Sequence, residues 1–148
     1  MDYKLELVLI PVSDVDRAKK FYLEQAGFVL IVDTPIGPDQ RVVQVVPPGS
    51  ECAIGFGTGI TSAAPGAAQG LHLVVSDILA ARAELTGRGV AVSGVRHIED
   101  GAWADGPHPD RANYESFADF TDPDGNIWIL QEVDRSGADR SKAEHGSD

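Results

Sequence analysis

Cysteine is almost absent from the sequence, in which Cys52 is the only one. A single cysteine excludes an intrachain disulfide and a zinc site built from several thiolates. Cys52 lies in the apolar run Cys52-Ala53-Ile54, which favours a small core residue over a reactive thiol. A long apolar run is also missing, because the N-terminal stretch at 7–12 has only six residues. We therefore expect neither a signal peptide nor a membrane span, and we predict a cytoplasmic protein.

Positive charge is scarce as well. The 148 residues carry 12 Lys+Arg against 23 Asp+Glu, which gives a formal net charge of −11. Such a field repels a phosphate backbone and suits a neutral or cationic ligand better than an anionic one. We predict no nucleic-acid and no membrane partner. The length suits one ordinary domain, or two small units that share a core.

An internal repeat is the most informative feature that is present. The tripeptide Val12-Ser13-Asp14 recurs as Val75-Ser76-Asp77, and the apolar positions around the two copies also correspond. Matching pairs include Ile10 with Leu73, Val15 with Ile78, and Ala18 with Ala81. Two similar stretches in one short chain indicate two copies of a supersecondary unit, each too small to bury its own apolar face.

Each copy reads as a strand, a helix and three further strands. In the first copy, residues 5–12 predict a strand, Ser13 or Asp14 begins a helix, and strands follow at 28–33, 41–46 and 52–56. In the second copy, the strand is 71–75, Asp77 begins the helix, and strands follow at 90–93, 116–120 and 127–133. The Gly- and Ala-rich residues 59–70 predict a linker, and residues 134–148 predict a disordered tail.

Two such modules in this order resemble the vicinal oxygen chelate superfamily, which contains glyoxalase I, the bleomycin-resistance proteins and the extradiol dioxygenases. The resemblance covers about residues 3–133 and is carried by Ile10-Pro11-Val12-Ser13-Asp14 with Phe21-Tyr22, by Leu73-Val74-Val75-Ser76-Asp77, and by Phe117 to Phe120 with Asp122-Pro123-Asp124-Gly125-Asn126. It implies an α+β fold in which two βαβββ modules pair into a cupped, partly closed mixed β-barrel, the glyoxalase/bleomycin-resistance/dihydroxybiphenyl-dioxygenase fold. We expect a single domain at 1–133, with module one at 3–60 and module two at 70–133.

The resemblance also implies where a divalent metal would bind. Enzymes of the superfamily hold it with side chains from the first and last strands of each module. The corresponding positions here are Leu7, Gly55, Gly70 and Ile129. None of these side chains can ligate a metal, so we predict no metal and no other cofactor.

Strand alternation predicts which residues line the cup. If Gly70 and Ile129 face it, His72 and Gln131 do so too, and Leu7 and Leu9 join them from the first strand, beside Gly55. The result is an apolar wall with few polar groups, which is typical of a small-molecule site. His72 is then a buried structural histidine, a ligand contact or a general base, and Gln131 has either a structural or a ligand-binding role.

A long predicted loop at residues 96–115 is the second candidate region, either as a lid over the cup or as a solvated loop. Trp103 and Tyr114 could stack on a flat ligand, and Arg111 could pair with an acidic group. The spacing of His97, Asp100, Asp105 and His108 matches no metal-site pattern.

Two functions follow from these patterns. The first is a metal-independent protein that holds a hydrophobic or aromatic molecule in the cup, as drug-sequestering members of the superfamily do, with a homodimer completing the crevice. The second is a glyoxalase-like lyase or isomerase acting on a carbonyl or natural-product substrate, with His72 as the catalytic base. Fold alone does not decide between them.

Overall fold

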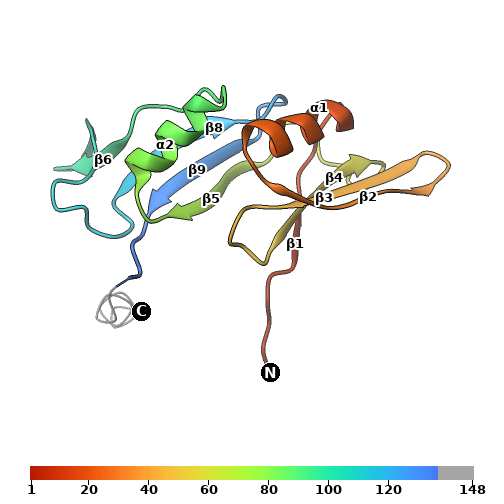
Figure 1. Cartoon of the computed structure of the whole chain (residues 1–148), viewed down its shortest axis with the longest axis horizontal. Helices are drawn as coiled ribbons and strands as arrows, with labels where there is room; N and C mark the ends of the chain where they lie inside the picture. Colours follow the sequence, from red (N-terminus) through yellow and green to blue (C-terminus); the bar gives the residue numbers. More distant parts are fainter. Residues whose placement is uncertain (137–148) are drawn as a thin grey trace.

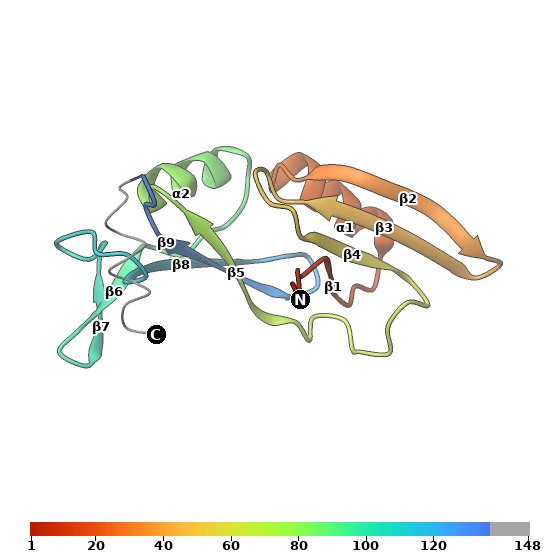
Figure 2. The same ribbon diagram turned by 90° about the horizontal axis from the view of Figure 1, so that it is seen from below.

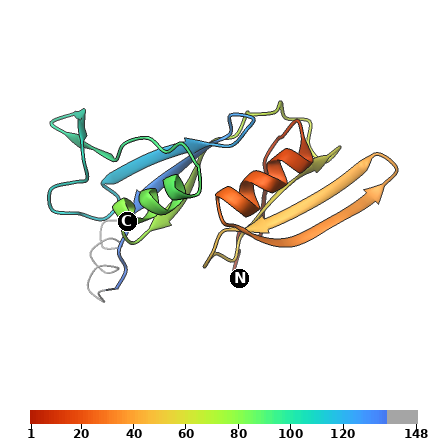
Figure 3. The same cartoon turned by 45° about the horizontal axis from the view of Figure 1, so that its top comes forward.

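The computed structural model describes residues 1–136, so most of the tail predicted at 134–148 lies outside the described residues. Its two modules lie side by side and follow one another along the chain (Figure 1). Each module has its own sheet with a helix against one face, as the turned views show (Figures 2 and 3). The α+β fold with two related modules is thus confirmed.

The first module contains β1 (Leu7–Leu9), α1 (Val15–Lys20), a π-helical turn (Phe21–Gln25), β2 (Val29–Gly37), β3 (Gln40–Val46) and β4 (Ala53–Thr58). Its sheet has the order β1-β4-β3-β2, with β1 parallel to β4. The Asp14 side chain caps α1 by accepting a hydrogen bond from the Arg17 amide, as the sequence predicts. The paired part of β1 is much shorter than the strand expected at 5–12.

The second module contains β5 (Gln69–Val75), α2 (Ile78–Gly87), β6 (Arg96–Glu99), β7 (Ala102–Asp105), β8 (Ser116–Thr121) and β9 (Ile127–Glu132). Its sheet has the order β5-β9-β8-β6-β7, with β5 parallel to β9. Asp77 caps α2 by accepting from the amides of Leu79 and Ala80. The two modules therefore repeat the same strand–cap–helix unit.

The prediction of a strand at 90–93 is wrong, and so is that of a continuous loop at 96–115. The strand that pairs with β8 is β6, which forms a hairpin with β7. Asp100 and Gly101 form the turn with φ values of 53° and 80°, as a two-residue hairpin requires. Charged residues in both arms of the hairpin hide the apolar alternation that would otherwise identify the strands.

One hydrophobic core joins the two modules. Tyr22 packs edge-on against Trp128 with ring centroids 5.8 Å apart, and Phe28 lies 5.5 Å from the same indole. The helix-facing sides of both sheets contribute to this core. Their opposite sides consequently point outward, and no hydrogen-bonded ladder connects the two sheets among the described residues. The barrel expected from the resemblance is thus left open within one chain.

A buried hydrogen-bond network fastens the modules together at this core. Tyr22 Oη donates to Asp122 Oδ2 at 2.7 Å and accepts from Trp128 Nε1 at 2.9 Å. Asn126 Nδ2 donates to Asp122 Oδ2 at 2.7 Å and to the Pro11 carbonyl at 2.8 Å. Burial, with the neighbouring Asp122 carboxylate, raises the pKa of Tyr22 far above its usual value. Tyr22 therefore stays neutral and donates.

Candidate functional site

The outward side of the second sheet, here called the open face, carries polar, apolar and aromatic side chains together. Residues paired in register lie on the same side of a sheet. Two rows of paired residues cross this face of the sheet. The first row is His72, Ile129 and Asp119, and the second is Val74, Gln131, Phe117 and Arg96. The hairpin adds Ile98 and Trp103, which are 50% and 54% exposed. The other side of the same sheet is buried, with Trp128 only 1% exposed.

An aromatic and charged corner stands at the hairpin end of the open face. Arg96 Cζ lies 4.7 Å from the centroid of the Trp103 ring, and Phe117 meets the same indole edge-on at 5.7 Å. Arg96 Nη2 donates to Asp119 Oδ2 at 2.8 Å and Nη1 to Ser93 Oγ at 3.1 Å. These contacts hold the indole in place while more than half of its surface stays exposed. Such a fixed aromatic surface suits the stacking of a flat ligand.

Two polar side chains predicted for the cup lie on the same face. His72 Nδ1 is 2.7 Å from the Gly70 carbonyl oxygen, which can only accept, so Nδ1 carries the proton and neutral His72 has Nε2 as its acceptor. Gln131 Nε2 donates to the Tyr114 carbonyl at 3.1 Å, which holds its amide in place. His72 is exposed, so the interpretation of a buried structural histidine is wrong.

The four positions that the resemblance implies for metal ligands lie close together in two pairs, Leu7 with Gly55 and Gly70 with Ile129. A Cβ atom added at Gly55 would lie 3.1 Å from Leu7 Cδ1 and 3.0 Å from Leu9 Cδ2. One added at Gly70 would lie 3.8 Å from Ile129 Cδ1. These positions offer no donor atom, and within residues 1–136 no group of three or more His, Cys, Asp or Glu side chains could hold a metal. The donor set does not fit a metal at this place.

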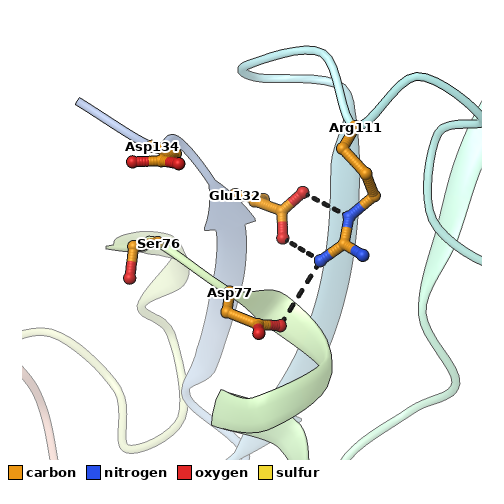
Figure 4. Close-up of a pocket in the computed structure, with 5 residues that line it drawn as sticks. All are labelled: Ser76, Asp77, Arg111, Glu132 and Asp134. Carbon is orange, nitrogen blue, oxygen red and sulfur yellow. Dashed lines mark hydrogen bonds and ion pairs between the residues drawn. The ribbon is translucent and has the colours of Figure 1, made fainter. Parts of the chain in front are cut away.

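Arg111 is not on the open face; it lies at the end of β9, in a pocket of about 420 Å³ (Figure 4). Its Nε and Nη2 atoms bind the two carboxylate oxygens of Glu132 at 2.8 Å and 2.5 Å, and Nη2 also reaches Asp77 at 3.3 Å. Hydrogen bonds from Arg111 hold the pKa of Glu132 below its usual value. Arg111 thus links the segment before β8 to the start of α2. Because its guanidinium is already paired with Glu132 and Asp77, its position does not support the predicted role of pairing with a ligand.

Tyr114 lies between these two regions. Its carbonyl contacts Gln131, its amide donates to the Glu132 carbonyl at 2.9 Å, and its hydroxyl accepts from Arg135 at 3.0 Å. The residues that sequence reasoning missed are Arg96, Phe117 and Asp119. The Asp100-Gly101 hairpin signal could have revealed them, because the register of β6 and β8 places them beside Trp103.

His97 secures the hairpin from its buried side. Its Nδ1 lies 2.7 Å from the Gly106 carbonyl and its Nε2 lies 3.0 Å from Glu99 Oε1. Both partners are acceptors, so the arrangement favours the doubly protonated ring. The Gly106 hydrogen bond, with a further contribution from Glu99, raises the pKa of His97 above its usual value.

This geometry predicts a pH dependence of stability. Because the folded-state pKa of His97 is raised, its stabilising effect is complete below the unfolded value of about 6.5 and is lost as the pH rises through the folded value. Urea unfolding of the wild-type protein and of His97→Gln should give a larger difference in free energy below about pH 6.5 than above about pH 9. Glu99→Gln should shift the loss to lower pH, and an equal difference at both pH values contradicts the assignment.

The fold is that of a known superfamily. The chain belongs to the Glyoxalase/Bleomycin resistance protein/Dioxygenase superfamily, whose family model matches residues 4–130. It is similar to TnmS3, an antibiotic binding protein from Streptomyces sp. CB03234, with 34% identity, a TM-score of 0.69, and coverage of 88% of this chain and 96% of that one. A glyoxalase/bleomycin resistance protein from the same organism is 35% identical, with a TM-score of 0.66 and coverage of 86% and 99%.

A curated relative, the uncharacterized protein YetH of Bacillus subtilis, is 25% identical over 126 residues, which cover 84% of this chain and 94% of the relative. Within residues 1–136, no helix has both the length and the apolar character needed to cross a membrane.

Proposed function

We propose that this protein binds a hydrophobic or aromatic small molecule on the open face of the second sheet, without a metal ion. The observation that carries the proposal is the exposed Trp103 indole, held by Arg96 and Phe117 on a face that also exposes the apolar Val74 and Ile98. His72, Asp119 and Gln131 add a few polar groups that could orient a ligand. The likeness to TnmS3, described as an antibiotic binding protein, supports the same class of function. We place the protein in the cytoplasm, as the sequence predicts.

A second copy of the chain would complete the site. The outward sides of both sheets leave large apolar side chains in water, including Leu9 and Val74, each 43% exposed. A ligand on a single open sheet keeps one side in water and gains little apolar burial. A homodimer that places another sheet opposite the open face would enclose the ligand from both sides.

Tryptophan fluorescence tests the binding directly, because the chain has two tryptophans in contrasting places. Trp103 is 54% exposed and Trp128 is 1% exposed. In a chelator-containing buffer, titration with a panel of hydrophobic and aromatic antibiotics should quench the Trp103 emission. In Trp103→Ala the ligand should bind about tenfold more weakly or worse, measured by calorimetry, because a stacking surface is removed.

Leu79→Ala is the matched control, because it truncates an exposed apolar side chain on α2 and should leave the affinity unchanged. Absence of binding across the panel, together with stoichiometric uptake of zinc, nickel or manganese, would overturn the proposal.

The geometry of His72 favours a lyase or isomerase as the second candidate. Its Nε2 is the acceptor on the open face and could remove a proton from a bound carbonyl compound. A bound compound that changes mass during incubation with the wild-type protein, but not with His72→Ala, would establish catalysis. Unchanged conversion by His72→Ala would remove this residue from the mechanism.

A further inference from the structure

The middle of the open face presents hydrogen-bond acceptors at both ends of an apolar strip. His72 of β5 and Asp119 of β8 lie on either side of Ile129 of β9, in one row across three strands. Neighbouring strands are about 4.8 Å apart, so the backbones of the two polar residues lie about 10 Å from each other. His72 Nδ1 donates to the Gly70 carbonyl, which leaves Nε2 of the neutral ring as an acceptor.

Asp119 supplies the acceptor at the other end of the row. Its side chain is 38% exposed, and its Oδ2 accepts from Arg96 Nη2 at 2.8 Å. Its Oδ1 accepts no hydrogen bond from any residue in 1–136. The Arg96 guanidinium is directed at Asp119, Ser93 and the Trp103 ring. Because Arg96 balances the charge of the carboxylate, Oδ1 offers a lone pair without an uncompensated negative charge.

Gln131 adds a third acceptor in the next row. Its Nε2 donates to the Tyr114 carbonyl, and its Oε1 accepts nothing within the part of the chain that the structure describes. A ligand that covers the face but brings only acceptors would strip water from these lone pairs and leave them unpaired, which costs affinity. A ligand that brings donors would pair them.

We propose that the ligand of the open face is a flat aromatic molecule whose phenolic hydroxyl groups donate to His72 Nε2 and Asp119 Oδ1. This inference rests on the proposed function and names the chemical class of its ligand. An anionic ligand would meet acceptor lone pairs and a chain of net charge −11, and an ammonium would compete with Arg96 for the carboxylate. A phenolic hydroxyl is a neutral donor held in the plane of a ring that can stack on Trp103.

Two probes of the same shape test the class. Naphthalene-2,6-diol carries a donor at each end of a flat body, whereas its dimethyl ether keeps the rings and both oxygens but has no donor. Their dissociation constants for the full chain are measured by calorimetry at pH 8 in a chelator-containing buffer. A hydrogen bond of ordinary strength changes affinity about fivefold, so the diol should bind the wild-type protein about tenfold more tightly than the ether, or better.

Substitution of each acceptor should reduce this preference. His72→Phe keeps a flat ring without an acceptor and should lower the ratio of the two dissociation constants about fivefold. Asp119→Asn keeps an oxygen for Arg96 and presents an amide donor to the ligand, so it should lower the ratio at least as much. Both probes are compared on the same variant, so a general loss of affinity cancels in the ratio. Asp39→Asn, at the exposed turn between β2 and β3, is the matched control and should leave the ratio unchanged.

The outcomes separate this inference from the proposed function. Equal binding of diol and ether by the wild type, or a preference that neither His72→Phe nor Asp119→Asn reduces, overturns the phenolic ligand while binding on the open face stands. The same holds if a compound of the antibiotic panel binds and neither probe does. Failure of the probes and of the whole panel overturns both.

Discussion

Asp122→Ala is expected to lower the free energy of unfolding by about 3 kcal/mol or more, because several buried donors lose their acceptor at once. Asp122 is 4% exposed. Its Oδ1 accepts from the amides of Asp124 and Asn126, both at 2.9 Å, and its Oδ2 accepts from Tyr22 Oη and Asn126 Nδ2. The substitution leaves the Tyr22 hydroxyl proton without a partner in the core that joins the modules.

Equilibrium urea unfolding measures this effect. Tyr22→Phe removes one of the four donors to Asp122 and the acceptor of Trp128 Nε1. It should cost less than Asp122→Ala, about 1–2 kcal/mol, because the other three donors keep the Asp122 carboxylate as their acceptor. Asp39→Ala, at an exposed turn between β2 and β3, is the matched control and should change stability by less than about 0.5 kcal/mol. If Asp122→Ala resembles this control, the network does not hold the modules together.

The sequence predicts the repeat well because its signals are local. A carboxylate at the start of each helix and an apolar strand before it are readable without tertiary contacts, and Asp14 and Asp77 cap their helices as expected. The network at Asp122 was not predictable, since Tyr22 and Asp122 are distant in sequence and meet only after the modules pack. The turn at 122–126 is recognisable as a turn, but its role in joining the modules is not.

The candidate site was predictable in part. Alternation along β5 and β9 correctly places His72 and Gln131 on one face with Ile129. The sequence placed both Trp103 and Arg111 in one predicted loop as ligand contacts. In the structure Trp103 lies on the open face, whereas Arg111 pairs with Glu132. Arg96 and Arg111 lie fifteen positions apart in one polar stretch and look alike in the sequence, and only strand register distinguishes them.

Gly57→Ala is the second substitution with a large expected effect. Gly57 lies in β4 opposite Val42 of β3, where the two backbones approach closely. A Cβ atom at Gly57 would lie 1.9 Å from the Arg41 carbonyl oxygen and 2.9 Å from its carbonyl carbon. This contact is with backbone, so no side-chain rotation can relieve it, and the β3–β4 ladder must shift.

We expect Gly57→Ala to lower the free energy of unfolding by about 3 kcal/mol or more. Gly87→Ala is the matched control, because Gly87 lies in the last turn of α2 and an added Cβ meets nothing within 4 Å. That substitution should raise stability by up to about 1 kcal/mol, since alanine favours helix. The two Gly→Ala substitutions should therefore change the free energy of unfolding, measured in urea, in opposite directions. A Gly57→Ala protein as stable as the wild type would show that β3 and β4 are farther apart than described.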